Sequence, residues 1–150
     1  MIKYLIFFLG LTILLSNNSS AQKMNEQQIE KKVKELLSKM SLEEKVGQMT
    51  QVILQVVSKK QGTRDQKHEL DLAKLEEAIV KYNVGSMLNV YDVAHSLEYW
   101  HEIINKIQDI AINKTPNKIP VFYGIDAIHG VTYTKGATLF PQSINMAATF

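Results

Sequence analysis

The residue of this sequence that is best placed for chemistry is an aspartate that follows a short apolar run. Residues 119–130 read IPVFYGIDAIHG, so Asp126 comes at the end of a predicted buried strand and lies between Gly124 and Gly130. In folds built on parallel strands, ligand sites gather at the carboxyl ends of the strands. An ionised carboxylate there can accept two charge-assisted hydrogen bonds from adjacent hydroxyls of a sugar. The same spacing also fits an aspartate that only caps a turn, and spacing alone does not separate the two.

The four histidines are weaker candidates. His129 follows Asp126 by three residues, where sugar contact is one interpretation and a local hydrogen bond within a glycine-bounded loop is the favoured one. His101 and Glu102 begin an HEIIN segment, which misses the metalloprotease pattern H-E-x-x-H by its last residue, so we predict no metal site. His68 and His95 are expected at the surface.

Several aromatic residues are of a type that can stack on a sugar ring, namely Trp100, Tyr123 and Phe140. Trp100 lies on an apolar helical stripe and Tyr123 lies inside a predicted strand, so core packing is the favoured role for both. Tyr133 and Lys135 fall in the segment after the aspartate motif, where we expect them at the rim of a site entrance.

The elements before this motif begin with two predicted helices. Residues 22–41 are polar except for an apolar set at helical spacing, which indicates a surface helix. That set is Ile29, Val33, Leu36, Leu37 and Met40. Ser41 and Glu44 have the spacing of a capping box, so a second helix is predicted to start there. Residues 49–57 are rich in β-branched side chains and predict a strand or buried segment, followed by a polar loop.

Further along, helix and strand patterns alternate. Residues 71–83 predict a helix, residues 84–90 a short buried strand, and residues 119–124 another strand. Between the strands lies a long amphipathic helix that Pro116 ends. Its predicted stripe is Leu97, Trp100, Ile104, Ile107 and Ala111. This alternation predicts an α/β fold with a parallel sheet, the N-terminal part of a TIM-type (β/α)8 barrel. Because such a barrel takes about 250 residues, we expect the barrel to be truncated at Phe150.

The composition of the chain excludes or disfavours several classes of function. The 150 residues carry a formal net charge of +2 and no cysteine, which disfavours a nucleic-acid partner and excludes a cysteine nucleophile or thiolate zinc site. Residues 1–21 combine Lys3, an apolar run and small residues ending at Ala21, a pattern typical of a cleavable signal peptide. We expect cleavage after Ala21, a secreted or periplasmic protein, and no stable membrane insertion after cleavage. Residues 22–150 then form the mature domain.

The motifs carry a family resemblance. YGIDAIHG, then GATLFPQ, then AAT at residues 147–149 resemble the G-I-D-A-x-H-G, G-A-T-x-F-P and A-T signature of glycoside hydrolase family 3, in its β-glucosidase and exo-β-glucanase branches. Residues 41–51, SLEEKVGQMTQ, are similar to the opening motif of that family, and Gly85-Ser86-Met87-Leu88 is similar to its G-S-[VIL]-L strand. The resemblance spans residues 29–150.

The resemblance implies a barrel followed by an α/β sandwich domain, with catalysis shared between them. The family aspartate that matches Asp126 holds hydroxyls of the terminal sugar, so Asp126 is the expected substrate-binding residue. Hydrolysis with retention needs two carboxylates about 5 Å apart. The resemblance places both of these catalytic groups beyond Phe150, so no catalytic residue is assigned within this chain.

The expectation is therefore an N-terminal fragment of a secreted retaining β-glucosidase that acts on terminal β-glucosyl residues of glucans or oligosaccharides, without a cofactor. The fragment alone is expected to be inactive. Two alternatives stay open at this point. One is a non-catalytic carbohydrate-binding or scaffold protein that uses Asp126 to hold sugar. The other is a truncated reading frame that does not fold.

Overall fold

The computed structural model describes residues 24–60, 68–89 and 94–149. The predicted signal peptide, residues 1–21, lies outside the described residues. The chain forms two compact units, residues 1–35 and 36–150. Helix α2 (Glu26–Lys39) begins in the first unit, where a surface helix was predicted, and none of its residues is buried. Ile29 and Val33 on its apolar stripe are 47% and 45% exposed.

Helix α3 (Leu42–Gln48) begins at the predicted capping box. The Ser41 hydroxyl accepts a hydrogen bond from the backbone N–H of Glu44 at 3.1 Å, and one carboxylate oxygen of Glu44 accepts from the Ser41 N–H at 2.7 Å. The other Glu44 oxygen accepts from the side-chain amide of Asn117 at 2.8 Å, a contact between residues 73 positions apart. The helix start is therefore tied to a distant turn.

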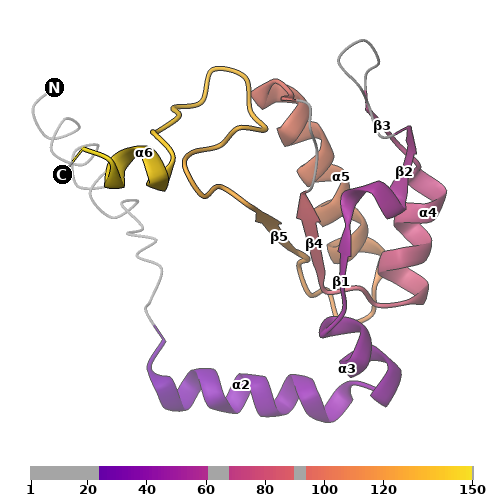
Figure 1. Cartoon of the computed structure of the whole chain (residues 1–150). Coiled ribbons are helices and arrows are strands. Elements are labelled where there is room, and N and C mark those ends of the chain that lie inside the picture. Colours follow the sequence, from indigo (N-terminus) through magenta and orange to yellow (C-terminus); the bar gives the residue numbers. More distant parts are fainter. Residues whose placement is uncertain (1–23, 61–67, 90–93, 150) are drawn as a thin grey trace, which may run out of the picture. The chain divides into compact units, whose positions relative to one another are not determined.

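Three parallel strands form the central sheet in the order β1 (Gln51–Ile53), β4 (Ser86–Asn89) and β5 (Phe122–Ile125), as Figure 1 shows. Met87 pairs with Val52 on one side and Tyr123 on the other, and this row faces the hydrophobic core. Because side chains alternate along a strand, Phe122 points to the opposite face, where it is 81% exposed. The described residues thus cover one face of the sheet.

Residues 49–57 were predicted to form a strand or a buried segment. Strand β1 ends at Ile53, and the residues beyond it form a partly buried segment that is not a strand. The chain there forms a 3-10 helix, η1 (Leu54–Val57), and then β2 (Ser58–Lys60), which pairs antiparallel with β3 (Glu69–Leu70). Three residues per turn place Leu54 and Val57 on the same side, and both are fully buried. Burial of this pair outweighs the β-propensity of the segment.

The helix predicted over residues 71–83 is present as α4 (Leu72–Glu76), which continues into a π-helical turn, η2 (Glu77–Lys81). Asp71 caps its start, since the carboxylate accepts from the backbone N–H groups of Ala73 and Lys74 at 3.1 and 3.2 Å. Asn83, with a φ of +54°, ends this helical segment, and β4 follows within the range predicted for a strand.

Helix α5 (Leu97–Lys114) contains the predicted amphipathic stripe and ends before Pro116 as predicted, but its buried face differs from that stripe. Its buried residues are Trp100, Ile103, Ile107, Ile110 and Ala111. Leu97, which the prediction placed on the buried stripe, is 55% exposed. The isoleucine-rich sequence offers two overlapping helical stripes, and packing against the sheet selects the one that contains Ile103 and Ile110.

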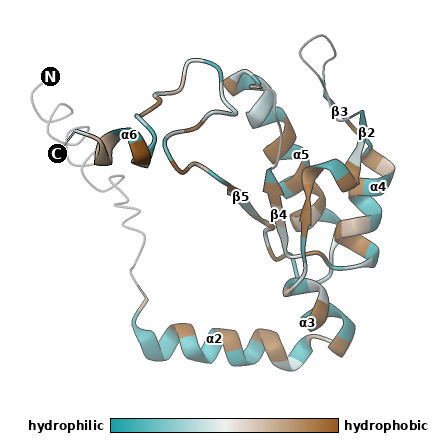
Figure 2. Cartoon of the chain, viewed as in Figure 1, coloured by the Kyte–Doolittle hydropathy of each residue, from teal (hydrophilic) through white to brown (hydrophobic). Residues whose placement is uncertain are grey.

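One hydrophobic core joins the sheet to these helices. Leu54, Leu75, Met87, Ile103 and Ile107 are each 0% exposed. Figure 2 shows apolar residues in the strands and along α4 and α5. The fold of residues 36–149 is therefore mixed α/β around a parallel sheet, as predicted. In the described part of the chain, no helix has both the length and the apolar character needed to cross a bilayer.

Candidate functional site

The carboxyl end of β5 carries Asp126. The strand ends at Ile125, which pairs with Asn89 at the end of β4, and Asp126 follows directly with an exposed side chain. Strand β1 ends at the same edge of the sheet with Ile53, because all three strands run parallel. The predicted position of the carboxylate, at the carboxyl end of a parallel strand, is therefore present.

The segment after Asp126 closes into a loop whose ends meet. Gly130 forms a bridge with Leu139, and the N–H of Phe140 donates to the carbonyl of His129 at 2.7 Å. Gly130 has a φ of +115°, and a Cβ there would lie 2.5 Å from the carbonyl oxygen of Thr138, so only glycine fits. The two motifs IDAIHG and GATLFP thus pack against each other as one unit.

His129 makes the local contact that was favoured for it. Its ring Nδ1 lies 3.2 Å from the carbonyl oxygen of Phe140, within the same loop. Phe140 itself is 62% exposed, so its ring is accessible at the surface of the described chain. Of the three aromatic candidates, Phe140 is therefore the one whose exposure suits contact with a ligand.

Trp100 and Tyr123 have the predicted core roles. Trp100 is 6% exposed, and its ring centroid lies 6.2 Å from that of Tyr123, which packs against the core. The indole N–H of Trp100 donates to the carbonyl of Tyr133 at 2.9 Å. Tyr133 is partly buried against the core rather than free at an entrance, whereas the side chain of Lys135 is exposed.

Asn89 is a polar residue of this edge that sequence reasoning missed. It lies at the end of β4 beside Ile125, it is 0% exposed, and neither its amide nitrogen nor its amide oxygen has a hydrogen-bond partner among the described residues. A polar amide inside the apolar run of residues 84–90 was the signal that could have found it.

The prediction that His68 and His95 are surface residues is wrong. They are 1% and 7% exposed, respectively. The ring Nε2 of His68 lies 2.7 Å from the hydroxyl of Ser58, and Nδ1 lies 3.0 Å from the hydroxyl of Tyr99. Burial, and then the neighbouring His95, lower the pKa of His68 from 6.5 to about 4. Residue type alone suggested exposure, because the contacts come from segments distant in sequence.

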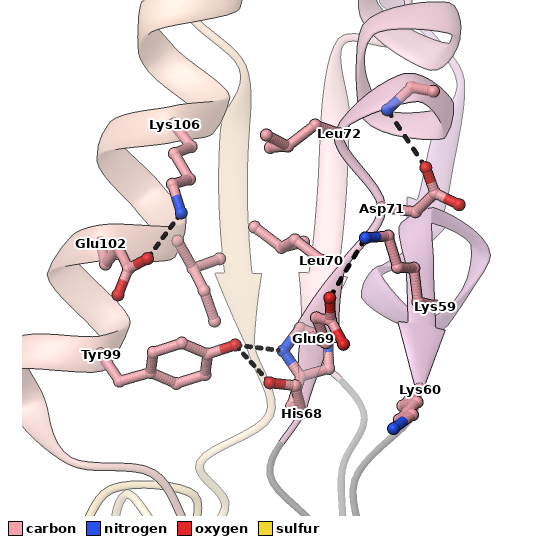
Figure 3. A pocket seen from close by; sticks show the side chains of 12 residues that line it. Lys59, Lys60, His68, Glu69, Leu70, Asp71, Leu72, Tyr99, Glu102 and Lys106 are labelled. Carbon is pink, nitrogen blue, oxygen red and sulfur yellow. Dashed lines mark hydrogen bonds and ion pairs between the residues drawn. The ribbon is translucent and has the colours of Figure 1, made fainter.

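A hollow of about 740 Å³ lies beside His68, between the β2–β3 hairpin, α4 and α5 (Figure 3). Its charged side chains are largely engaged with one another. Lys59 pairs with Glu69 at 3.1 Å, and Lys106 pairs with Glu102 at 2.5 Å. None of the residues that line it comes from the Asp126 loop. We therefore place the candidate site at the sheet edge rather than in this hollow.

Residues 101–105, the HEIIN segment that resembles a metalloprotease pattern, have no metal-binding geometry. Glu102 is paired with Lys106, and His101 is exposed on α5. Within residues 24–60, 68–89 and 94–149, no three or more His, Asp or Glu side chains group as metal ligands.

This chain is similar to known proteins over the segment that contains these motifs. Residues 41–150 match the family described as "Glycosyl hydrolase family 3 N terminal domain". A relative named lysosomal beta glucosidase, from Dictyostelium discoideum, is 40% identical over 126 residues, which cover 79% of this chain. The match spans only 15% of the length of that relative. On the extent of the family match, this chain belongs to glycosyl hydrolase family 3.

Proposed function

We propose that this chain is the N-terminal part of a secreted retaining β-glucosidase in which Asp126 holds the terminal sugar. The observation that carries the proposal is the exposed carboxylate of Asp126 at the carboxyl end of a parallel strand. A sugar presents adjacent hydroxyls, and a carboxylate accepts from both at once. The name of the Dictyostelium relative supports a substrate class of terminal β-glucosyl residues in glucans or oligosaccharides.

We further propose that β1, β4 and β5 are the first strands of a (β/α)8 barrel that continues beyond Phe150. Two observations support this. The sheet is parallel, and such sheets are normally covered on both faces, yet Phe122 is 81% exposed on the face away from α5. In a closed barrel that face becomes the filled interior.

The proposed chemistry needs two carboxylates outside this chain, one that attacks the anomeric carbon and one that protonates the leaving oxygen. Several carboxylates within the described part have other partners. Glu44 accepts hydrogen bonds in the α3 cap, Asp71 caps α4, and Glu102 pairs with Lys106. Because the family resemblance matches Asp126 to a sugar-holding aspartate, Asp126 is proposed as a binding residue and not as the nucleophile.

Secretion is proposed from the leader-like residues 1–21, with cleavage after Ala21. The relative is named as a lysosomal enzyme, which is compatible with entry into a secretory pathway. Sequencing of the N-terminus of the exported protein tests this, and we expect it to begin at Gln22. A mature protein that still begins at Met1 would contradict the proposal.

The substrate role is tested by kinetics of the full-length protein that contains this chain, with p-nitrophenyl β-glucoside as substrate. Asp126→Ala removes two charge-assisted hydrogen bonds, each worth roughly 1.5–3 kcal/mol, so kcat/KM should fall by about 10²–10⁴-fold. Asp109→Asn is the matched control, because Asp109 is an exposed aspartate whose carboxylate accepts from the side chain of Asn113 on the same helix. Its kcat/KM should stay within about twofold of wild type.

The same experiment separates the alternatives. Wild-type kcat/KM in Asp126→Ala would remove Asp126 from the substrate site. Binding of β-glucosides by the full-length protein without any turnover would favour a non-catalytic carbohydrate-binding protein instead.

A further inference from the structure

A second hollow, of about 640 Å³, lies between α3, β1, η1 and η2, and its lining is mostly apolar. The apolar side chains that line it include Leu42, Val46, Val52, Val56 and Tyr82. All of these except Val52 are more than half exposed. We call this space the apolar hollow. Large apolar side chains that gather in one exposed place mark a surface that another element covers.

Helix α3 borders the apolar hollow but does not fill it, because α3 lies beyond the amino end of β1 (Figure 1). Its contacts are with the segment that leads into β4. The Gly47 carbonyl accepts from the Gly85 N–H at 3.0 Å, and the Gln48 side-chain amide donates to the Asn83 carbonyl at 3.1 Å. The outer face of β1 therefore stays open beside η2.

The helices that cover the sheet follow the order of its strands. The segment α4–η2 lies between β1 and β4 in the chain, α5 lies between β4 and β5, and α5 packs against η2. Right-handed crossovers place each such helix over the two strands that it joins. The apolar hollow is lined by Val52 of β1 and by Ala78 of η2, and no α5 residue lines it. It therefore lies on the flank of η2 that α5 does not cover.

Strand β1 is also an edge of the sheet. Among the residues that the structure describes, it pairs with β4 alone. In a closed barrel the first strand pairs with the last, and each helix packs against the strand before it and the next strand around the ring. The helix that follows the last strand therefore covers that strand and the first one. In this fold its place is beside η2 and over β1, where the apolar hollow lies.

We propose that the apolar hollow is the docking site of the last helix of the barrel, a segment of the full-length protein beyond Phe150. This inference rests on the barrel given under the proposed function. The Dictyostelium relative has the length to supply such a helix, since the match spans only 15% of it. Because a barrel takes about 250 residues, the helix should lie roughly 250 residues after Leu42.

The chemistry of the apolar hollow fits one face of an amphipathic helix. Such a helix presents apolar side chains at positions i, i+3, i+4 and i+7. The cation at the hollow is already engaged, because Lys81 Nζ pairs with the Glu77 carboxylate at 2.8 Å. A second copy of the chain is a poorer occupant, because a closed barrel needs its own last helix at this place whichever copies meet elsewhere.

The test places a photoreactive side chain in the apolar hollow of the full-length protein. Tyr82→p-benzoylphenylalanine replaces one exposed aromatic side chain by another, so folding should be retained. After irradiation, mass spectrometry identifies the attached peptide. We expect a crosslink within the same polypeptide, to a peptide roughly 250 residues after Leu42. A crosslink to the sandwich domain, a covalent dimer, or no crosslink would overturn the inference.

Phe122→p-benzoylphenylalanine is the matched control, because Phe122 is an exposed aromatic residue on the opposite face of the sheet. In a closed barrel that face is the interior, so position 122 should crosslink to barrel strands and not to the last helix. If it does so while position 82 does not reach the last helix, the barrel stands and the docking inference fails. If neither position reaches a barrel segment, both fail. Kinetics of the Asp126 variant decide the sugar-binding role separately.

A second measurement needs no variant. Oxidation of Tyr82 by hydroxyl radicals is compared between the folded and the urea-unfolded full-length protein. A Tyr82 that keeps its 57% exposure should react at about half the unfolded rate, whereas a covered one should react at about a tenth of that rate or less. A rate near half would overturn the inference, whatever the activity of the protein.

Discussion

Gly47 in α3 lies against the segment that leads into β4, and Gly47→Ala is the sharpest test of this packing. A Cβ at position 47 would lie 2.3 Å from the carbonyl oxygen of Tyr82, 2.6 Å from Cβ of Asn83 and 2.7 Å from the Asn83 carbonyl oxygen. Two of these three neighbours are backbone atoms, so a change of rotamer cannot relieve the contact. Normal separations between such atoms are about 3.5 Å, so the two segments would have to move apart by roughly 1 Å.

Two opposing effects decide whether Gly47→Ala raises or lowers the free energy of unfolding. Alanine is a better helix former than glycine by about 1 kcal/mol, which favours the variant because Gly47 lies inside α3. Overpacking costs about 1–3 kcal/mol. The movement also stretches the bond from Gly85 N–H to the Gly47 carbonyl, at 3.0 Å, and the bond from Gln48 Nε2 to the Asn83 carbonyl, at 3.1 Å. Each of these bonds contributes about 1 kcal/mol.

We therefore expect Gly47→Ala to lower the free energy of unfolding by about 2–4 kcal/mol. Urea unfolding of the full-length protein, with the transition of this domain followed by hydrogen exchange, measures it. Gly124→Ala is the matched control, because its Cβ would meet the tip of the Leu88 side chain at 3.4 Å and the Met87 carbonyl oxygen at 3.9 Å, both acceptable separations. It should change stability by less than about 0.5 kcal/mol. A Gly47→Ala protein as stable as wild type, or more stable, would refute the close approach of the two segments.

Three further outcomes are expected. Ser41→Ala should lower the unfolding free energy by about 1 kcal/mol, measured by thermal denaturation, because the α3 cap loses its hydroxyl acceptor. The folded-state pKa of His68, about 4, lies below the ordinary 6.5, so the stability from neutral His68 is complete above pH 6.5 and is lost as pH falls toward 4. At pH 5 the loss is about 2 kcal/mol relative to pH 7.5, and urea unfolding of wild type against His68→Gln at both pH values isolates it. The 150-residue chain alone should not hydrolyse p-nitrophenyl β-glucoside and should aggregate through its open strand edges, so turnover or cooperative unfolding of a soluble monomer would contradict us.

The sequence predicted those features that local chemistry decides. The capping box of Ser41 and Glu44 depends on residues three apart, and it is present as predicted. Asp126 follows β5 because the apolar run before it ends there, and this position could be identified from a single segment. The end of α5 before Pro116 is likewise local, since a proline cannot continue the helix.

Features that depend on distant contacts were not predicted. The burial of His68 involves contacts with Ser58 and Tyr99, which lie 10 and 31 positions away, and no local sequence pattern indicates these contacts. The choice of Ile103 rather than Ile104 for the buried side of α5 depends on where the sheet lies. The role of Asp126 in sugar binding stays a prediction, because position alone does not distinguish a ligand from a turn cap.

The double use of Glu44 constrains how this domain can change over generations. One of its oxygens closes the start of α3 and the other holds Asn117. Replacement of Asn117 leaves the cap of α3 intact, whereas replacement of Glu44 removes both the cap and the contact with Asn117. A substitution of Glu44 should therefore be tolerated more readily after Asn117 has been substituted than before. Among descendants of this sequence, a changed residue 44 should occur mainly where residue 117 has already changed.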